Sequence, residues 1–246
     1  MDPRLAQVPV VLALAEASGG DLAGLYVGGS LASSDYRPGI SDIDAVALVE
    51  HRPGAPLRRA VVARHRQLGA TALHCVYVAR PEATDPTVKH WTWAFEELFR
   101  RPLGGIARAE LLADPVVVHG PAPAGWLPPM TVDAVRIAAA ADLSGYWRTA
   151  LRKKRIWHED VYVDQAVTAV ARADITVEQG RLATKSEAIA HLPRLGLRED
   201  IVAGVLRRRA GEGTSLTSVE RSERGATVRR FVAYHLDRLD ELVRVS

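Results

Sequence analysis

Two short segments near the N-terminus carry the residues best suited to chemistry. Gly28, Gly29 and Ser30 form one segment, and Asp42 and Asp44 follow after a short loop. Glycines let the backbone approach a polyphosphate closely, and a serine offers its N–H and hydroxyl to phosphate oxygens. In an extended segment, side chains two residues apart project to the same side, and two carboxylates together with substrate phosphates suit Mg²⁺. The combination predicts a magnesium site that handles a nucleoside triphosphate.

Strands are expected on both sides of these segments. The apolar stretches at 23–28 and 43–50 have the composition of buried strands, which would hold the turn and the two acids rigidly. A Gly-Gly-Ser alone is usually an ordinary turn, and an Asp-x-Asp alone is usually a solvated strand end. The functional interpretation therefore depends on finding both with strands around them.

The first half of the chain alternates between helix and strand patterns. Helices are expected over 5–17, with Pro9 tolerated near the start, and over 56–68, followed by a strand at 73–78. A set of short helices and an extended segment at 115–121 complete this half. Alternation of this kind predicts a mixed sheet covered by helices.

The second half has a helical pattern almost throughout. Apolar residues recur at three- and four-residue spacing after Thr131, in the runs 161–179, 185–192, 197–210 and 218–244. A Pro-rich stretch that cannot sustain a helix or a strand precedes them. We expect an α+β chain with an N-terminal domain over 1–122, a linker over 123–130 and a helical bundle over 131–246.

The motifs resemble the polymerase-beta-like nucleotidyltransferase superfamily, whose pattern is a Gly-Ser, a variable loop and an Asp-x-Asp that opens a strand. Within it the chain is similar to the aminoglycoside adenylyltransferases that modify streptomycin and spectinomycin, and residues 117–121 look like that family's crossover into a helical domain. The resemblance implies Mg²⁺-dependent transfer of AMP from ATP to a hydroxyl of a small acceptor. Asp42 and Asp44 would hold the metal and act in catalysis, and Gly29 and Ser30 would contact ATP.

The resemblance also implies cationic contacts to the triphosphate from the second half. Arg172, and Lys185 after a turn, match family positions that reach the phosphates. Thr184 suits a helix N-cap, which would place Lys185 at a positive helix end. The alternative is that both are solvated surface cations.

An aromatic residue and carboxylates line the acceptor cleft of that family. Trp91 and Trp93 lie near the matching aromatic position, and Glu159 and Asp160 lie near the matching acids, with Asp164 close by. A cationic acceptor would be attracted to carboxylates, and a tryptophan face can pack on an ammonium or a sugar. Tryptophans at this spacing equally suit core packing.

The chain departs from the family at its third carboxylate, whose position is taken by His74. An imidazole can act as a general base near neutral pH, but it suits softer metals than Mg²⁺. Three alternatives remain open: a histidine base, a third acid from elsewhere with Glu50 and Glu82 as candidates, and a protein that binds nucleotide or drug without turnover. A transferase acting on a partner protein is a further rival, although the long helical half favours a small-molecule cleft.

Composition sets broad limits on the class of protein. The chain has 246 residues and a net charge of +3. Its hydrophobic content of 48% is enough for a buried core. Aromatic residues are 6% and no dense basic run occurs, so no nucleic-acid partner is expected. There is neither a stretch for a membrane span nor a signal-peptide pattern, and the single cysteine, Cys75, forms no internal disulfide. We expect a cytoplasmic protein, and the sequence gives no indication of its oligomeric state.

Overall fold

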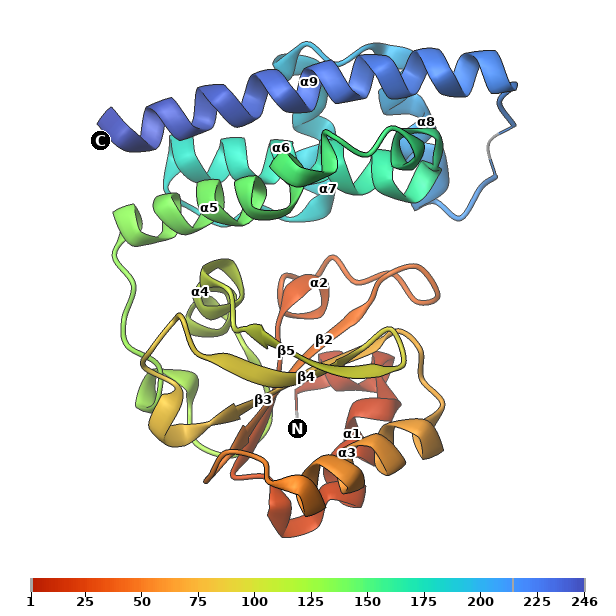
Figure 1. The fold of residues 1–246 in the computed structure, drawn as a ribbon. Helices are drawn as coiled ribbons and strands as arrows, with labels where there is room; N and C mark the ends of the chain where they lie inside the picture. The colour runs from red at the N-terminus through yellow and green to blue at the C-terminus, as the bar shows by residue number, and fades with distance from the viewer. Residues whose placement is uncertain (1, 214, 246) are drawn as a thin grey trace. The chain divides into compact units, whose positions relative to one another are not determined.

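The computed structural model describes residues 2–213 and 215–245, and the chain divides into two compact units, Met1–Pro129 and Met130–Ser246 (Figure 1). The first unit contains the β-sheet. The described part of the second unit consists of helices and their connections. The α+β fold expected from the sequence is thereby confirmed, and its domain limits stay a prediction.

A six-stranded mixed sheet forms the centre of the first unit. The strands lie in the order β5-β4-β3-β2-β1-β6. β2 and β3 are parallel, and the other neighbouring pairs are antiparallel. Their bounds are β1 (Gly24–Val27), β2 (Ile43–Val49), β3 (Leu73–Ala79), β4 (Lys89–Ala94), β5 (Glu97–Pro102) and β6 (Val116–His119).

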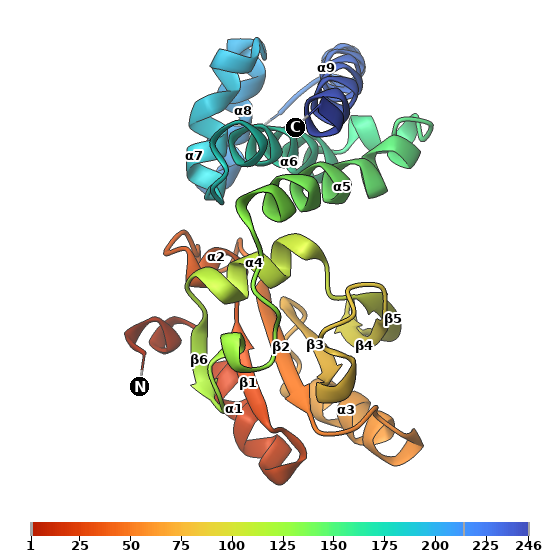
Figure 2. The same cartoon turned by 90° about the vertical axis from the view of Figure 1, so that its left-hand side faces the viewer.

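Helices cover both faces of this sheet because its central strands are apolar on both sides. Ala45 and Ala47 of β2 face a core formed with α1 (Pro9–Ser18) and α3 (Ala55–Leu68), which pack against each other (Figure 1). Val46 and Leu48 face a second core that includes Leu111 of α4 (Gly105–Ala113). The short helix α2 (Gly29–Ala32) directly follows β1 and lies beside α4 (Figure 2).

The expectation of several short helices after β3 is wrong in part, because most of this region is the β4–β5 hairpin. Residues 89–94 alternate between faces, with Thr92 on one face and Trp91 and Trp93 on the other. Phe95 and Glu96 form the two-residue turn, both with positive φ angles of 54° and 60°. This geometry is the one that β-hairpins favour, although both residues are unusual in it.

The Pro-rich segment packs on the first unit. Residues Pro123–Gly125 form a single 3-10 turn, after which Trp126 and Leu127 are buried in the core on the α4 face. The Trp126 ring lies 5.5 Å from that of Tyr26, and the Tyr26 hydroxyl donates to the carbonyl oxygen of Pro121 at 2.7 Å. Residues up to Leu127 thus contribute side chains to the core around β1.

A helical bundle forms the second unit, as expected. Helices α5, α6 and α9 contact one another pairwise, and α7 packs on α6. Thr131 caps α5 by accepting from the N–H of Ala134 at 3.1 Å. The bounds are α5 (Val132–Ala150), α6 (Asp160–Gln179), α7 (Lys185–His191), α8 (Glu199–Arg209) and α9 (Ser218–Val245).

One buried carboxylate ties three of these helices together. Asp174 of α6 is 3% exposed, accepts a hydrogen bond from Nε2 of His191 at 2.8 Å, and forms an ion pair with Arg238 of α9. Removing one partner of such a buried charge is strongly destabilising, because the remaining charge is left without compensation. The cluster therefore fixes α7 and α9 against α6.

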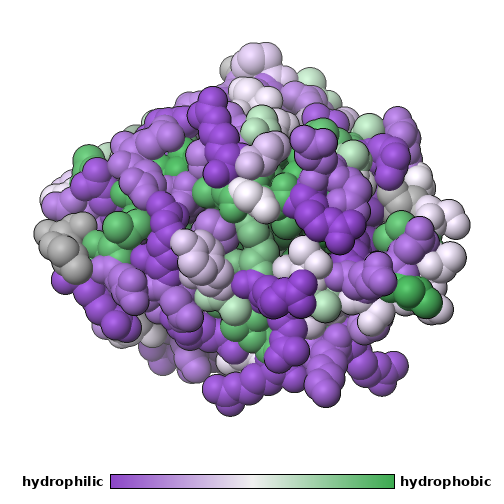
Figure 3. All heavy atoms as spheres, turned by 90° about the horizontal axis from the view of Figure 1, so that it is seen from above, coloured by the Kyte–Doolittle hydropathy of each residue, from purple (hydrophilic) through white to green (hydrophobic). Residues whose placement is uncertain are grey.

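The face of the molecule seen in Figure 3 is mostly hydrophilic, with apolar side chains in several small patches. Among the residues that the structure describes, no helix combines the length and the hydropathy needed to cross a bilayer.

Candidate functional site

The Gly28–Gly29 turn and the Asp44 carboxylate converge in the structure. The N–H of Gly28, at the end of β1, donates to the carbonyl oxygen of Asp44 at 2.9 Å. Gly29 has a φ angle of 58°, and a Cβ placed on it would lie 2.4 Å from Oδ2 of Asp44. The carboxylate therefore lies directly against the Gly29 backbone, in space that is open only because residue 29 has no side chain. Ser30 follows inside α2 and is buried.

Asp42 and Asp44 are the two exposed acids at the start of β2. Asp44 is the second residue of the strand and is exposed, whereas the other β2 residues are buried. Asp42 is also exposed and stands just before the strand begins at Ile43. Strand alternation thus fixes the direction of Asp44, while Asp42 lies in the connecting segment.

The carboxylate oxygens of Asp42 and Asp44 are the kind of ligand that Mg²⁺ prefers. Both offer carboxylate oxygens, and the Asp44 carboxylate lies beside the proposed phosphate turn. Within the described residues, no group of three His, Cys, Asp or Glu side chains is placed to hold a metal ion by itself. Mg²⁺ commonly needs only one or two carboxylates when substrate phosphates supply further ligands, so an all-protein cage is not required.

His74 stands next to Asp44 on the neighbouring strand. The parallel register of β2 and β3 pairs Asp44 with His74, so both side chains project from the same face of the sheet. His74 is 8% exposed, and its ring lies 4.9 Å from that of Phe95 in the β4–β5 turn. The structure thus brings the predicted base to the predicted carboxylate, with most of the imidazole covered.

Glu50 and Glu82 are not placed to supply a third acid. Glu50 follows the far end of β2, which at about 3.3 Å per residue lies roughly 20 Å from Asp44. It is paired with Arg80 at 3.0 Å, and Glu82 is paired with Arg52 at 2.5 Å. The idea that either completes the site is wrong, because Glu50 follows β2 and Glu82 follows β3, at the end of these parallel strands opposite to Asp44.

Glu110 is a carboxylate at the turn that the sequence analysis missed. It lies on α4, and its Oε2 accepts a hydrogen bond from the N–H of Gly29 at 3.2 Å. The same oxygen lies 3.9 Å from the position that a Cβ on Gly28 would take. No local motif marks this residue, because the contact joins segments that are 81 positions apart in the chain.

Trp91 and Trp93 lie on the other face of the sheet from Asp44. In the register of β3 with β4, Trp93 is opposite Cys75 and Trp91 is opposite Tyr77. Cys75 and Tyr77 belong to the core on the α1 and α3 side. The two tryptophans are therefore not brought together with the predicted metal site.

Contacts of the two rings explain this placement. Trp93 is 4% exposed and stacks on His65 with ring centroids 5.0 Å apart. Trp91 is half-buried, with the guanidinium of Arg58 at 4.9 Å and that of Arg100 at 5.9 Å from its ring. The structure thus favours the packing alternative for Trp93, while the Trp91 ring is occupied by two cations of the protein itself.

Titratable groups beneath this face are held neutral by burial. Burial lowers the pKa of His65 to about 4, with the nearby Arg64 acting in the same direction. The Nε2 of His65 and the Tyr77 hydroxyl are hydrogen-bonded at 2.9 Å. Burial also raises the pKa of the Cys75 thiol to about 12, so Cys75 is a structural residue.

Arg172 and Lys185 lie close in the second unit. Nε of Arg172 donates to the carbonyl oxygen of Ala183 at 2.9 Å, just before α7 begins at Lys185. Thr184 and Glu187 form the capping box that starts this helix, which confirms the expected N-cap. Arg172 thus positions the segment that carries Lys185, and both side chains are half-buried.

Asp160 and Asp164 are paired with arginines of their own unit. Asp160 lies 2.5 Å from Arg224, and Asp164 lies 2.6 Å from Arg208. Burial acts to raise the pKa of Asp160, but the Arg224 hydrogen bond and Arg208 hold it below its ordinary value. Burial raises the pKa of Asp164 despite its arginine. Asp160 is thus paired within the bundle, whereas Glu159 is exposed, and the assignment of these acids to an acceptor stays a prediction.

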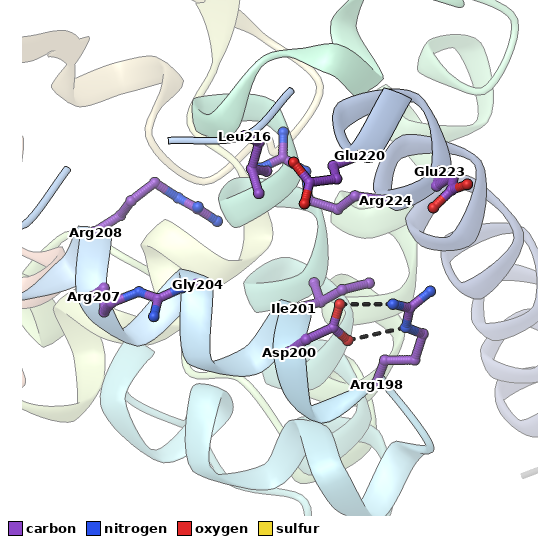
Figure 4. Close-up of a pocket in the computed structure, with 10 residues that line it drawn as sticks. All are labelled: Arg198, Asp200, Ile201, Gly204, Arg207, Arg208, Leu216, Glu220, Glu223 and Arg224. Atoms are coloured by element: carbon purple, nitrogen blue, oxygen red, sulfur yellow. Dashed lines mark hydrogen bonds and ion pairs between the residues drawn. The ribbon is translucent and has the colours of Figure 1, made fainter. Parts of the chain in front are cut away.

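A cavity of about 260 Å³ lies between α8 and the start of α9 in the second unit (Figure 4). Arg208 and Arg224 line it, and the Arg198–Asp200 ion pair stands at another part of its wall. Neither Arg172 nor Lys185 is among the lining residues, so this cavity is separate from the expected triphosphate contacts.

Comparison with known proteins shows a likeness of fold. No family model matches the chain, and no curated protein matches it. A solved structure similar to it is that of spectinomycin adenyltransferase AAD(9) from Enterococcus faecialis with ATP and spectinomycin. The TM-score is 0.69 at 14% sequence identity, over 96% of this chain and 98% of that one. The likeness expected from the sequence is confirmed at the level of the fold.

Proposed function

We propose that this chain is a nucleotidyltransferase that moves AMP from ATP to a hydroxyl of a small acceptor, with Mg²⁺ at Asp42 and Asp44. The observation that carries the proposal is the convergence of the Asp44 carboxylate with the Gly28–Gly29 turn. The fold shared with an adenyltransferase that was crystallised with ATP supports the same reaction class.

Each residue has a defined task in this reaction. Asp42 and Asp44 hold the cation, Gly29 lets the backbone approach the phosphates, and Ser30 offers its N–H and hydroxyl to the phosphate oxygens. When bound, Mg²⁺ supplies charge neutralisation at the phosphates. The acceptor oxygen forms a bond to the α-phosphorus while the bond from that phosphorus to the bridging oxygen breaks, and pyrophosphate leaves. Positioning of these groups supplies much of the rate.

In this proposal, two cationic side chains of the second unit bind the triphosphate. Arg172 and Lys185 contact phosphate oxygens, as the family resemblance implies, and the Arg172 hydrogen bond to Ala183 holds the segment that carries Lys185. Fixed cations near developing negative charge stabilise the transition state.

His74 is the proposed general base. Its position beside Asp44 on the same face of the sheet supports this role. The proton of the acceptor hydroxyl passes to the imidazole nitrogen as the new bond to phosphorus forms. His74 also motivates the second candidate, a protein that binds nucleotide or drug without turnover.

The proposed acceptor is an aminoglycoside-type or other small hydroxyl compound. The fold-level neighbour was crystallised with spectinomycin, which supports this class of acceptor. Glu159 is the remaining exposed carboxylate of the set expected to attract a cationic acceptor, because Asp160 is held by arginines.

The test is pyrophosphate release from Mg²⁺-ATP across a panel of aminoglycosides. Asp42→Asn and Asp44→Asn should each lower turnover by several orders of magnitude while the far-UV circular dichroism stays unchanged. Asp114→Asn, an exposed carboxylate at the end of α4, serves as the control and should retain activity. Near-full activity of either site variant would disprove the metal assignment, and tight ATP binding without any release would favour the second candidate.

A further inference from the structure

The hydrogen bond between Gly29 and Glu110 occupies a backbone donor of the proposed phosphate turn. A backbone N–H is one donor, and here it points to a carboxylate oxygen of α4 at 3.2 Å. The Asp44 carboxylate lies against the same glycine from the β2 side. Two carboxylates therefore flank the backbone that is proposed to approach a triphosphate.

A phosphate oxygen and the Glu110 carboxylate cannot both take this single N–H in full. Both groups are anions, so a phosphate that approaches Gly29 is repelled by a carboxylate a few ångströms away. Nucleotide binding at the turn therefore requires the carboxylate to release the N–H or to tolerate a close negative charge.

We propose that Glu110 is a positioning residue of the nucleotide site: its carboxylate holds the Gly29 N–H in the nucleotide-free protein and yields it to a phosphate oxygen when nucleotide binds. This rests on the proposed function. Glu110 thereby lowers the affinity for nucleotide and keeps the turn ordered between binding events. Since α2 packs against α4, the Gly29 N–H and the Glu110 carboxylate are held next to each other.

A purely structural role makes a different prediction. If Glu110 only stabilised the turn, its replacement would leave nucleotide affinity unchanged or weaken it. If Glu110 competes with phosphate, removing its negative charge strengthens binding. Glu110→Gln separates the two, because glutamine keeps the size and a neutral hydrogen-bond acceptor while it removes the charge.

The experiment is isothermal titration calorimetry of a non-hydrolysable ATP analogue, with EDTA and separately with Mg²⁺, at low and high salt. We expect Glu110→Gln to bind about fivefold more tightly than the wild type, with a smaller gain at high salt because added ions screen the repulsion. The matched control is Glu16→Gln, an exposed glutamate of α1, which packs on the opposite face of the sheet. It removes the same charge and should bind as the wild type does.

Equal or weaker binding by a folded Glu110→Gln would overturn the inference, and weaker binding confined to Mg²⁺ would assign Glu110 to the cation instead. Urea unfolding midpoints verify that both variants are folded. If the wild type binds no nucleotide under any condition, the proposed function fails, and this inference fails with it. If the wild type binds and Glu110→Gln merely matches it, this inference alone fails.

Discussion

Gly29→Ala tests the convergence of the turn and Asp44 most directly. Alanine at a φ angle of 58° is strained by about 1 to 2 kcal/mol. The new methyl group would also lie 2.4 Å from Oδ2 of Asp44, so the carboxylate has to move by about 1 Å to reach an ordinary contact distance. A misplacement of this size at reacting groups costs about 100-fold in rate.

Gly69→Ala provides a matched control for the backbone strain. Gly69 has a φ angle of 60°, and no atom lies within 4 Å of the position that a Cβ would take. Urea unfolding should show a loss of about 1 to 2 kcal/mol for Gly69→Ala and at least that loss for Gly29→Ala. Turnover, measured by pyrophosphate release, should fall about 100-fold for Gly29→Ala and stay near the wild-type value for Gly69→Ala. Equal turnover of the two variants would refute the assigned position of the Asp44 carboxylate.

Two further predictions concern buried charge. Unfolded His65 takes up a proton near pH 6.5, whereas folded His65 does so near pH 4, so the free energy of unfolding should fall by up to about 3 kcal/mol as pH drops across this window. Urea unfolding of His65→Phe should show a flatter pH dependence, and an unchanged slope would contradict the burial effect. Arg238→Ala should lose about 3 kcal/mol in urea unfolding, because Asp174 keeps a buried charge with one partner fewer. A loss under about 1 kcal/mol would show that His191 and solvent are enough to compensate the charge of Asp174.

Local pattern predicted the elements around the site well. The apolar segments that became β1, β2 and β3 are buried on both faces, which leaves a continuous apolar signal in the sequence. The Thr131 and Thr184 caps mark where α5 and α7 begin. These features depend on neighbouring residues, and a sequence pattern reports them directly.

Local sequence patterns do not predict which strands pair across the sheet. The Phe95–Glu96 turn lacks the glycine or asparagine that normally signals a hairpin, so the β4–β5 pair was missed. Without that hairpin, the sequence does not show on which face of the sheet Trp91 and Trp93 project, so an acceptor cleft and core packing are both open for them. Their face is fixed by register with β3, a contact between strands.

The partners of charged side chains are also hard to predict from the sequence when they come from distant segments. The spacing of Asp42 and Asp44 indicated a site because it is encoded within three residues. Glu110 reaches Gly29 only through the packing of α4, and the partners of Asp160 come from α8 and α9. An exposed acid and a neutralised one look alike in sequence, since burial and pairing are decided by distant segments.

The burial of Trp126 against Tyr26 bears on how the N-terminal half can be prepared in isolation. A fragment cut at residue 122 would lose the indole and leave an open apolar depression beside β1, inviting aggregation. A fragment that ends at Pro129 keeps Trp126 in place over Tyr26, so Pro129 is the better C-terminal residue for preparing the first unit alone.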